Sequence, residues 1–188
     1  MSNVRLLTPR RFGDERGWFS ETYNARSLAA AGLDMAFVQD NRAFSRAVGT
    51  LRGLHYQVPP YGQAKLLSCV RGRIYDVAVD VRKGSPTFGK WVGAELTAEN
   101  GKQLFVPVGF AHGYVTLEPD TEVFYKVTGY YAPDHEGGVR FDDPEIGIDW
   151  QLPPTGALLS PKDRILPSLR EIDSPFAYDG TPLTLLEA

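Results

Sequence analysis

The chain has 188 residues, 43% hydrophobic and 23% charged, which is the balance of an ordinary globular protein and predicts a single domain over 1–188. Its 20 Lys and Arg against 23 Asp and Glu give a formal charge of −3, so no global basic field indicates a nucleic-acid partner. The N-terminus has no signal-like apolar region and no stretch is long enough to span a bilayer, so we predict a cytoplasmic protein without a membrane partner.

The predicted elements are mainly short strands. A helix is expected first, over 25–31, with Asn24 as its N-cap and Gly32 as its left-handed end. Nineteen glycines and 14 prolines then divide the chain into short apolar or alternating runs. The expected strands are 65–70, 73–81, 91–96, 103–106, 113–117 and 122–127. The run 73–81 alternates most clearly. From Pro153 onward, frequent prolines predict loops that wrap the barrel.

Two segments place histidines beside turn glycines at the ends of predicted strands: 51–57 with His55, and 107–114 with His112. The second segment fits the pattern Pro-x-Gly-x-x-His, which is typical of the second half of a cupin, a double-sheet jelly roll that often holds a metal. The first half supplies one histidine, and no Glu follows it before Glu95. Two histidines are fewer ligands than a catalytic metal normally has, so we predict no metal.

Several motifs in one order resemble the dTDP-4-dehydrorhamnose 3,5-epimerase family, from residue 14 to residue 164. They are Asp14-Glu15-Arg16-Gly17, Gln39-Asp40-Asn41, Leu51-Arg52-Gly53-Leu54-His55-Tyr56-Gln57, Asp76-Val77-Ala78-Val79-Asp80-Val81-Arg82, Ser85-Pro86-Thr87-Phe88-Gly89, Gly109-Phe110-Ala111-His112-Gly113, Tyr125-Lys126 and Ser160-Pro161-Lys162-Asp163. The resemblance implies an all-β cupin jelly-roll barrel with a few short peripheral helices. It also implies a homodimer, a dTDP-4-keto-6-deoxyhexose substrate and catalysis without a cofactor.

The resemblance also assigns catalytic roles, and the chemistry explains them. Hydrogens on C3 and C5 flank the C4 ketone, so removal of either gives an enolate. His55 would be the base, because a neutral imidazole titrates near working pH. Asp163 would hydrogen-bond the far ring nitrogen of His55. Lys65 would stabilise the enolate oxygen, and Tyr125 would return a proton from the opposite face, as inversion requires.

Further residues are assigned to the nucleotide part of the substrate. The resemblance places Arg16, Arg52 and Lys162 at the sugar diphosphate, and Glu21, Gln39, Asn41 and Tyr131 at the deoxythymidine end or along its approach. It also implies that Glu136 and His112 close the pocket. Strict strand alternation would point Arg52 and His55 in opposite directions, so we expect a bulge at Gly53 if both reach one ligand. Ala43 departs from the family pattern, in which a hydroxyl residue is common.

Three alternatives stay open from the sequence. A relative that inverts only C3 or only C5 would share the base and the barrel, although the presence of Tyr125 favours double inversion. A metal-dependent cupin oxygenase would need a metal at His55 and His112. A non-catalytic sugar-binding barrel would bind thymidine diphosphate without proton exchange. For the homodimer, an N-terminal strand exchanged between partners is expected to bury Val4, Leu6 and Leu7.

Overall fold

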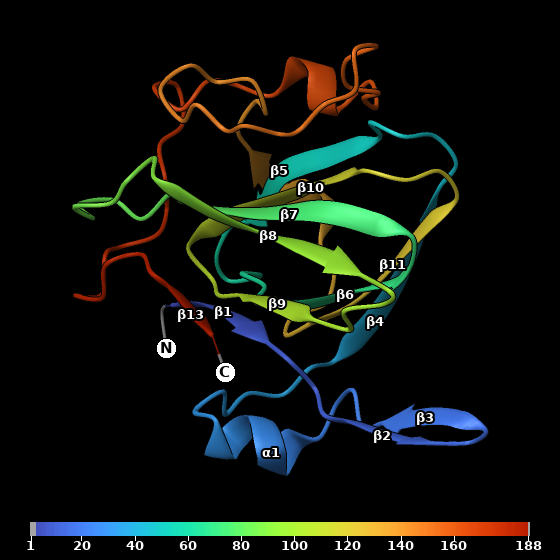
Figure 1. Ribbon diagram of the computed structural model, residues 1–188. Coiled ribbons are helices and arrows are strands. Elements are labelled where there is room, and N and C mark those ends of the chain that lie inside the picture. The colour runs from blue at the N-terminus through green and yellow to red at the C-terminus, as the bar shows by residue number, and fades with distance from the viewer. Residues whose placement is uncertain (1–2, 188) are drawn as a thin grey trace.

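Two β-sheets face each other across the core of the computed structural model, which describes residues 3–187 (Figure 1). The six-stranded sheet has the order β13 (Leu185–Glu187), β1 (Val4–Leu7), β9 (Gln103–Val106), β6 (Lys65–Arg71), β11 (Thr121–Val127) and β4 (Gln39–Ser45). The five-stranded sheet has the order β12 (Glu136–Gly138), β5 (Leu51–Gln57), β10 (Phe110–Thr116), β7 (Arg73–Asp80) and β8 (Trp91–Thr97). The predicted all-β, double-sheet architecture is confirmed.

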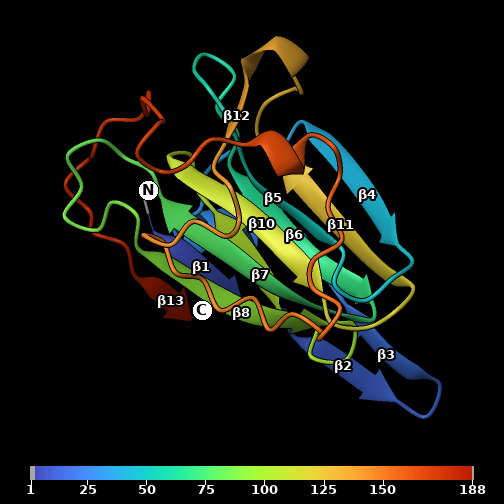
Figure 2. The same ribbon diagram turned by 90° about the horizontal axis from the view of Figure 1, so that it is seen from above.

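The central core lies between the two sheets, and each sheet also has a covered outer face. Strand β7 shows why: Ile74 and Ala78 belong to the cluster between the sheets, whereas Val77 and Val79 belong to a second cluster on the other face. That outer face is covered by the C-terminal segment, which runs across the five-stranded sheet in Figure 2. Both faces of the strand are buried, and the set that contains Ile74 and Ala78 also carries the buried carboxylates Asp76 and Asp80.

The helix and the hairpin lie outside the barrel. Helix α1 (Ala25–Ala30) begins at Asn24, whose side chain accepts hydrogen bonds from the backbone N–H groups of Arg26 and Ser27, and Gly32 is left-handed at φ +80°. Strands β2 (Arg11–Asp14) and β3 (Gly17–Ser20) form a two-stranded hairpin that projects from the barrel (Figure 1). The predicted helix and its two boundary residues are therefore confirmed.

The predicted strands are present, with ends shifted by a few residues, and the two ends of the chain form neighbouring strands of the six-stranded sheet. Val4, Leu6 and Leu7 are buried because β1 pairs with β9 of its own chain, so their burial needs no exchange with a partner. The proline-rich tail is mostly loop as predicted, but it ends in β13, which adds to the exposed edge of β1 in parallel.

The expected bulge in β5 is present and decides which side chains face the core. His55 pairs with His112 on β10, whereas Arg52 pairs with Tyr114, so Gly53 and Leu54 on β5 are matched by Gly113 alone on β10. Gly53 supplies the extra residue with φ +136°, and a Cβ atom there would lie 2.5 Å from the Cα of Gly113. Only glycine fits this backbone approach, and the bulge lets Arg52 and His55 face the same pocket.

Candidate active site

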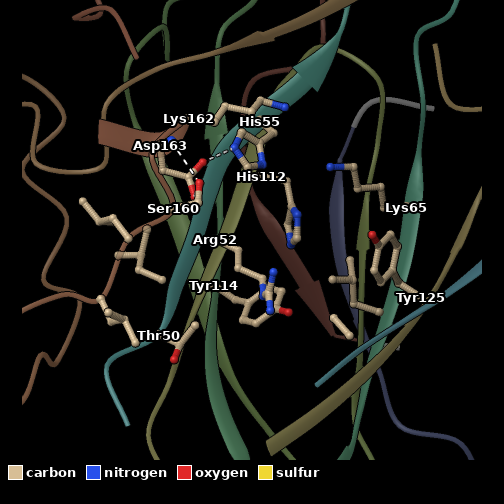
Figure 3. A pocket seen from close by; sticks show the side chains of 15 residues that line it. Thr50, Arg52, His55, Lys65, His112, Tyr114, Tyr125, Ser160, Lys162 and Asp163 are labelled. Carbon is tan, nitrogen blue, oxygen red and sulfur yellow. Dashed lines mark hydrogen bonds and ion pairs between the residues drawn. The ribbon is translucent and has the colours of Figure 1, made fainter. Parts of the chain in front are cut away.

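A cavity of about 440 Å³ opens between the two sheets, and three parts of the chain line it (Figure 3). The five-stranded sheet contributes Arg52, His55, His112 and Tyr114, and the six-stranded sheet contributes Ala43, Lys65, Leu67 and Tyr125. The loop 158–160, Lys162 and Asp163 form the remaining wall. The fold therefore brings all four predicted catalytic residues to one pocket.

His55 and Asp163 form a hydrogen-bonded pair. The Nε2 atom of His55 lies 2.5 Å from Oδ1 of Asp163, which begins a short 3₁₀ helix, Asp163–Ile165. The hydroxyl of Ser160 donates to the other carboxylate oxygen at 2.8 Å. Burial alone would raise the pKa of Asp163, but its hydrogen bonds to His55 and Ser160 and the imidazole charge lower the pKa below the ordinary value. The carboxylate is thus ionised and orients the ring, leaving Nδ1 of His55 for the pocket.

A second histidine–carboxylate pair lies deeper in the same wall. Nε2 of His112 is 2.6 Å from Oδ1 of Asp76, and both side chains are buried. Burial lowers the pKa of His112 despite the charge of Asp76, so the imidazole is neutral at pH 7. Donating its Nε2 proton to Asp76 leaves Nδ1 as an acceptor, which suits a ligand hydroxyl.

Lys65 and Tyr125 stand on the opposite wall from His55 (Figure 3). Burial lowers the pKa of Lys65 to about 8, although the charges of Asp76 and Glu136 oppose this shift. Burial raises the pKa of Tyr125 despite the nearby Arg52. The lysine therefore offers an ammonium at neutral pH, and the tyrosine keeps its phenolic proton. A base on one wall faces a proton donor on the other.

A second cavity of about 330 Å³ adjoins the first, since His55, Lys65 and Tyr125 line both. Its other lining residues are polar or aromatic and include Gln39, Asn41, Gln57, Tyr131 and Glu136. Gln39 bridges two of them: its amide donates to Asn41 Oδ1 at 2.8 Å, and its carbonyl accepts from the backbone N–H of Tyr131 at 3.1 Å. Lys162 pairs with Glu136 at the rim. A ligand can thus extend from the reacting groups into this cavity.

Two predicted binding residues lie away from both cavities. Arg16 is at the tip of the β2–β3 hairpin, where it pairs with Asp14 in solvent. Glu21 accepts a hydrogen bond from Asn24 beside helix α1 and lines a separate groove. Neither side chain therefore reaches the pocket of its own chain.

Tyr114 is a polar residue of the pocket that sequence reasoning missed. Tyr114 lines the main cavity, and its buried hydroxyl has no hydrogen-bond partner among residues 3–187. Tyrosines in strands most often pack, so the sequence offers no signal that separates this one. Only the bulge at Gly53 and the pairing with Arg52 reveal its position.

The donor set does not fit a metal centre. Within residues 3–187 no group of three or more His, Cys, Asp and Glu side chains converges on one point. His55 and His112 each engage a carboxylate through Nε2 instead. No helix in the described part of the chain is long and apolar enough to cross a membrane.

Comparison with known proteins gives one consistent result. The family model described as dTDP-4-dehydrorhamnose 3,5-epimerase matches residues 1–171. The enzyme of that name from Sinorhizobium fredii is 51% identical over 178 residues, covering 95% of this chain and 91% of its own length. A Legionella pneumophila epimerase structure in complex with dTDP-4-keto-L-rhamnose has a TM-score of 0.87 and 44% identity, covering 92% of each chain. A 3′-monoepimerase from Streptomyces bikiniensis, in complex with dTDP-quinovose, has a TM-score of 0.82 and 38% identity, covering 89% of this chain and 84% of its own.

Proposed function

Because this chain belongs to the dTDP-4-dehydrorhamnose 3,5-epimerase family, it is an isomerase with the cupin jelly-roll fold, and we propose that His55 and Tyr125 carry its proton transfers. The substrate is a dTDP-4-keto-6-deoxy sugar whose C3 and C5 are inverted. The observation that carries the proposal is the placement of a carboxylate-oriented histidine and a protonated tyrosine on opposite walls of one cavity.

His55 removes the proton next to the ketone. Its Nδ1 faces the pocket because Nε2 is held by Asp163, and the imidazolium that forms is stabilised by that carboxylate. The side chain of His55 is 28% exposed, so the proton it gains can exchange with water between turnovers. Deuterium from the solvent should therefore enter the substrate.

Lys65 stabilises the enolate that proton removal creates. The negative charge moves to the C4 oxygen, and a buried ammonium next to that oxygen lowers the barrier more than an exposed one, because little water screens it. Neutral His112 accepts a hydrogen bond from a sugar hydroxyl at the same end of the cavity. The two groups also orient the ring between His55 and Tyr125.

Tyr125 delivers a proton to the face opposite His55. Its raised pKa keeps the phenol protonated, and its position across the cavity matches the geometry that inversion requires. Arg52 and Lys162 bind the diphosphate, and the adjoining cavity with Gln39, Asn41 and Tyr131 receives the nucleoside. Glu136 pairs with Lys162 at the rim of the adjoining cavity.

A homodimer accounts for the two predicted residues that the chain's own pocket lacks. The hairpin that carries Arg16 exposes Phe12, Trp18 and Phe19, a set of aromatic side chains that a second copy would cover. Glu21 directly follows this hairpin. If both residues bind nucleotide, they reach the pocket of a neighbouring copy. A sedimentation mass close to twice 20.8 kDa is expected, and a mass near that of one chain would contradict the dimer.

The first test is proton NMR of the enzyme with dTDP-4-keto-6-deoxyglucose in D₂O. We expect deuterium at both C3 and C5 with the unaltered chain, and at neither carbon with His55→Ala. His135→Ala is the matched control, because His135 lines neither cavity. Exchange by His55→Ala within tenfold of the unaltered rate would reject His55 as the base.

The same spectra test the single-site alternative, which the likeness to a 3′-monoepimerase keeps relevant. Deuterium at C3 alone would identify this chain as a monoepimerase. Deuterium at both carbons with formation of the L-rhamno product supports double inversion. The cytoplasmic location inferred from the sequence stays a prediction.

A further inference from the structure

Tyr114 carries a hydroxyl that neither the fold nor the proposed proton transfers use. The side chain lies on β10 and is only 4% exposed, and its Oη atom has no partner among residues 3–187. A buried hydroxyl without a partner has lost its hydrogen bond to water and gained nothing in return. Burial raises the pKa of Tyr114, so the group keeps its proton and remains a donor. Such a donor on a pocket wall indicates a missing acceptor.

The surroundings of Tyr114 indicate what that acceptor is. Its strand pairing places it opposite Arg52 on β5, and the two side chains lie together in Figure 3. The guanidinium of Arg52 donates to the backbone oxygen of Phe44 at 3.2 Å and to the hydroxyl of Ser45 at 3.5 Å, both through one nitrogen. A guanidinium has five N–H donors, so others remain for a ligand. A hydroxyl donor and a guanidinium at one end of the cavity suit an oxygen-rich, anionic group.

We propose that Tyr114 is a substrate-binding residue whose hydroxyl donates a hydrogen bond to an oxygen of the sugar diphosphate, beside Arg52. This inference rests on the proposed function, because it takes the sugar nucleotide as the ligand. Tyr114 stands on the same wall as His55, so it cannot deliver a proton to the opposite face and its contribution is to affinity. The competing explanation is structural. Oδ2 of Asp76 on the neighbouring strand also lacks a partner, and a bridge between Asp76 and Tyr114 would serve the fold alone.

The test replaces Tyr114 with Phe, which removes the hydroxyl and keeps the ring. One hydrogen bond to a ligand oxygen corresponds to roughly 3- to 10-fold in affinity. We therefore expect Tyr114→Phe to weaken binding of the substrate by that factor in calorimetry and to raise KM similarly, with kcat within about twofold. The melting temperature without ligand should stay equal or rise, since an unpartnered buried group is removed. Tyr75→Phe, on the outer face of the same sheet against Trp91, is the matched control.

Binding of dTDP alone shows which oxygen is involved. Weaker dTDP binding by Tyr114→Phe would place the bond on a phosphate, and weaker binding of the sugar nucleotide alone would place it on the sugar; either result supports the proposal. Unchanged affinity for both ligands, or a lower melting temperature without ligand, would overturn it in favour of the structural explanation. These binding data are independent of turnover. If the unaltered chain binds the sugar nucleotide but exchanges no deuterium, the proposed function is refuted. The role of Tyr114 is then still decided by whether Tyr114→Phe weakens binding.

Discussion

Replacing Asp163 with Asn removes the charge of the carboxylate and keeps its shape. The Asn carbonyl can accept from Nε2 of His55, as Oδ1 of Asp163 does at 2.5 Å. The Asn amide can donate to the hydroxyl of Ser160, which now donates to the second carboxylate oxygen at 2.8 Å. Since both hydrogen bonds have replacements, we expect the fold to persist. The imidazolium formed during proton removal loses its counter-charge.

The size of that loss follows from the geometry of the pair. Two unit charges 2.5 Å apart at an effective dielectric constant of about 20 interact by roughly 6–7 kcal/mol. The amide dipole and the water that reaches the partly exposed His55 should recover about half of this. A barrier increase of about 3–4 kcal/mol corresponds to a 10²- to 10³-fold lower kcat. KM should change little, because Asp163 is only 4% exposed and acts through His55.

The assay is deuterium exchange at C3 and C5 in D₂O together with steady-state kinetics. Asp142→Asn is the control, because Asp142 is an exposed carboxylate that pairs with Arg140 and lines neither cavity. We expect the control to keep the unaltered rate. If Asp163→Asn exchanges deuterium within tenfold of the unaltered chain, the carboxylate does not stabilise the imidazolium and the reasoning fails.

Four further predictions test other parts of the site and the fold. Because the pKa of Lys65 is about 8, kcat/KM should fall above about pH 8, and Lys65→Arg should move this decline to higher pH; a decline that stays in place would implicate another group. Because burial disfavours the charged form of Lys65, the charged lysine lowers the stability of the fold below pH 8, and this cost disappears as the pH rises from about 8 to 10.5. Thermal denaturation should therefore show that Lys65→Met is more stable than the unaltered chain at pH 7, by a margin that narrows at pH 10. Tyr125→Phe should still exchange deuterium but form the inverted product at least about 10²-fold more slowly, measured by NMR, and product formation at the unaltered rate would exclude Tyr125 as the acid. Gly53→Ala should lower the free energy of unfolding, measured in urea, by about 3 kcal/mol, because the added Cβ would lie 2.5 Å from the Cα of Gly113. The control Gly84→Ala also has a positive φ but meets no atom within 4 Å, so it should lower the free energy of unfolding by only about 1 kcal/mol. Equal losses would show that backbone strain alone, and not the contact with Gly113, sets the cost.

The sequence by itself predicted the features that depend on residues close to one another along the chain. Glycine and proline spacing predicted an all-β chain, and the alternation in 73–81 predicted a strand, because side chains in a strand alternate with period two. Burial of both faces of that strand is a finding of the structure. Asn24 and Gly32 predicted the ends of the helix, since capping involves atoms only a few residues apart. The family resemblance, which rests on motif order, supplied His55, Lys65, Tyr125 and Asp163 as one set.

Tertiary structure decided which side chains meet. His55 and Asp163 are 108 positions apart, and their hydrogen bond exists because the C-terminal segment folds back over the five-stranded sheet. The geometry of the bulge at Gly53 set the direction of Arg52, since one extra residue turns a strand's side chains to the other face. Burial of the Tyr114 hydroxyl, and the distance of Arg16 and Glu21 from the chain's own pocket, have no local signal. They depend on how sheets and hairpin pack in three dimensions, which spacing along the chain does not encode.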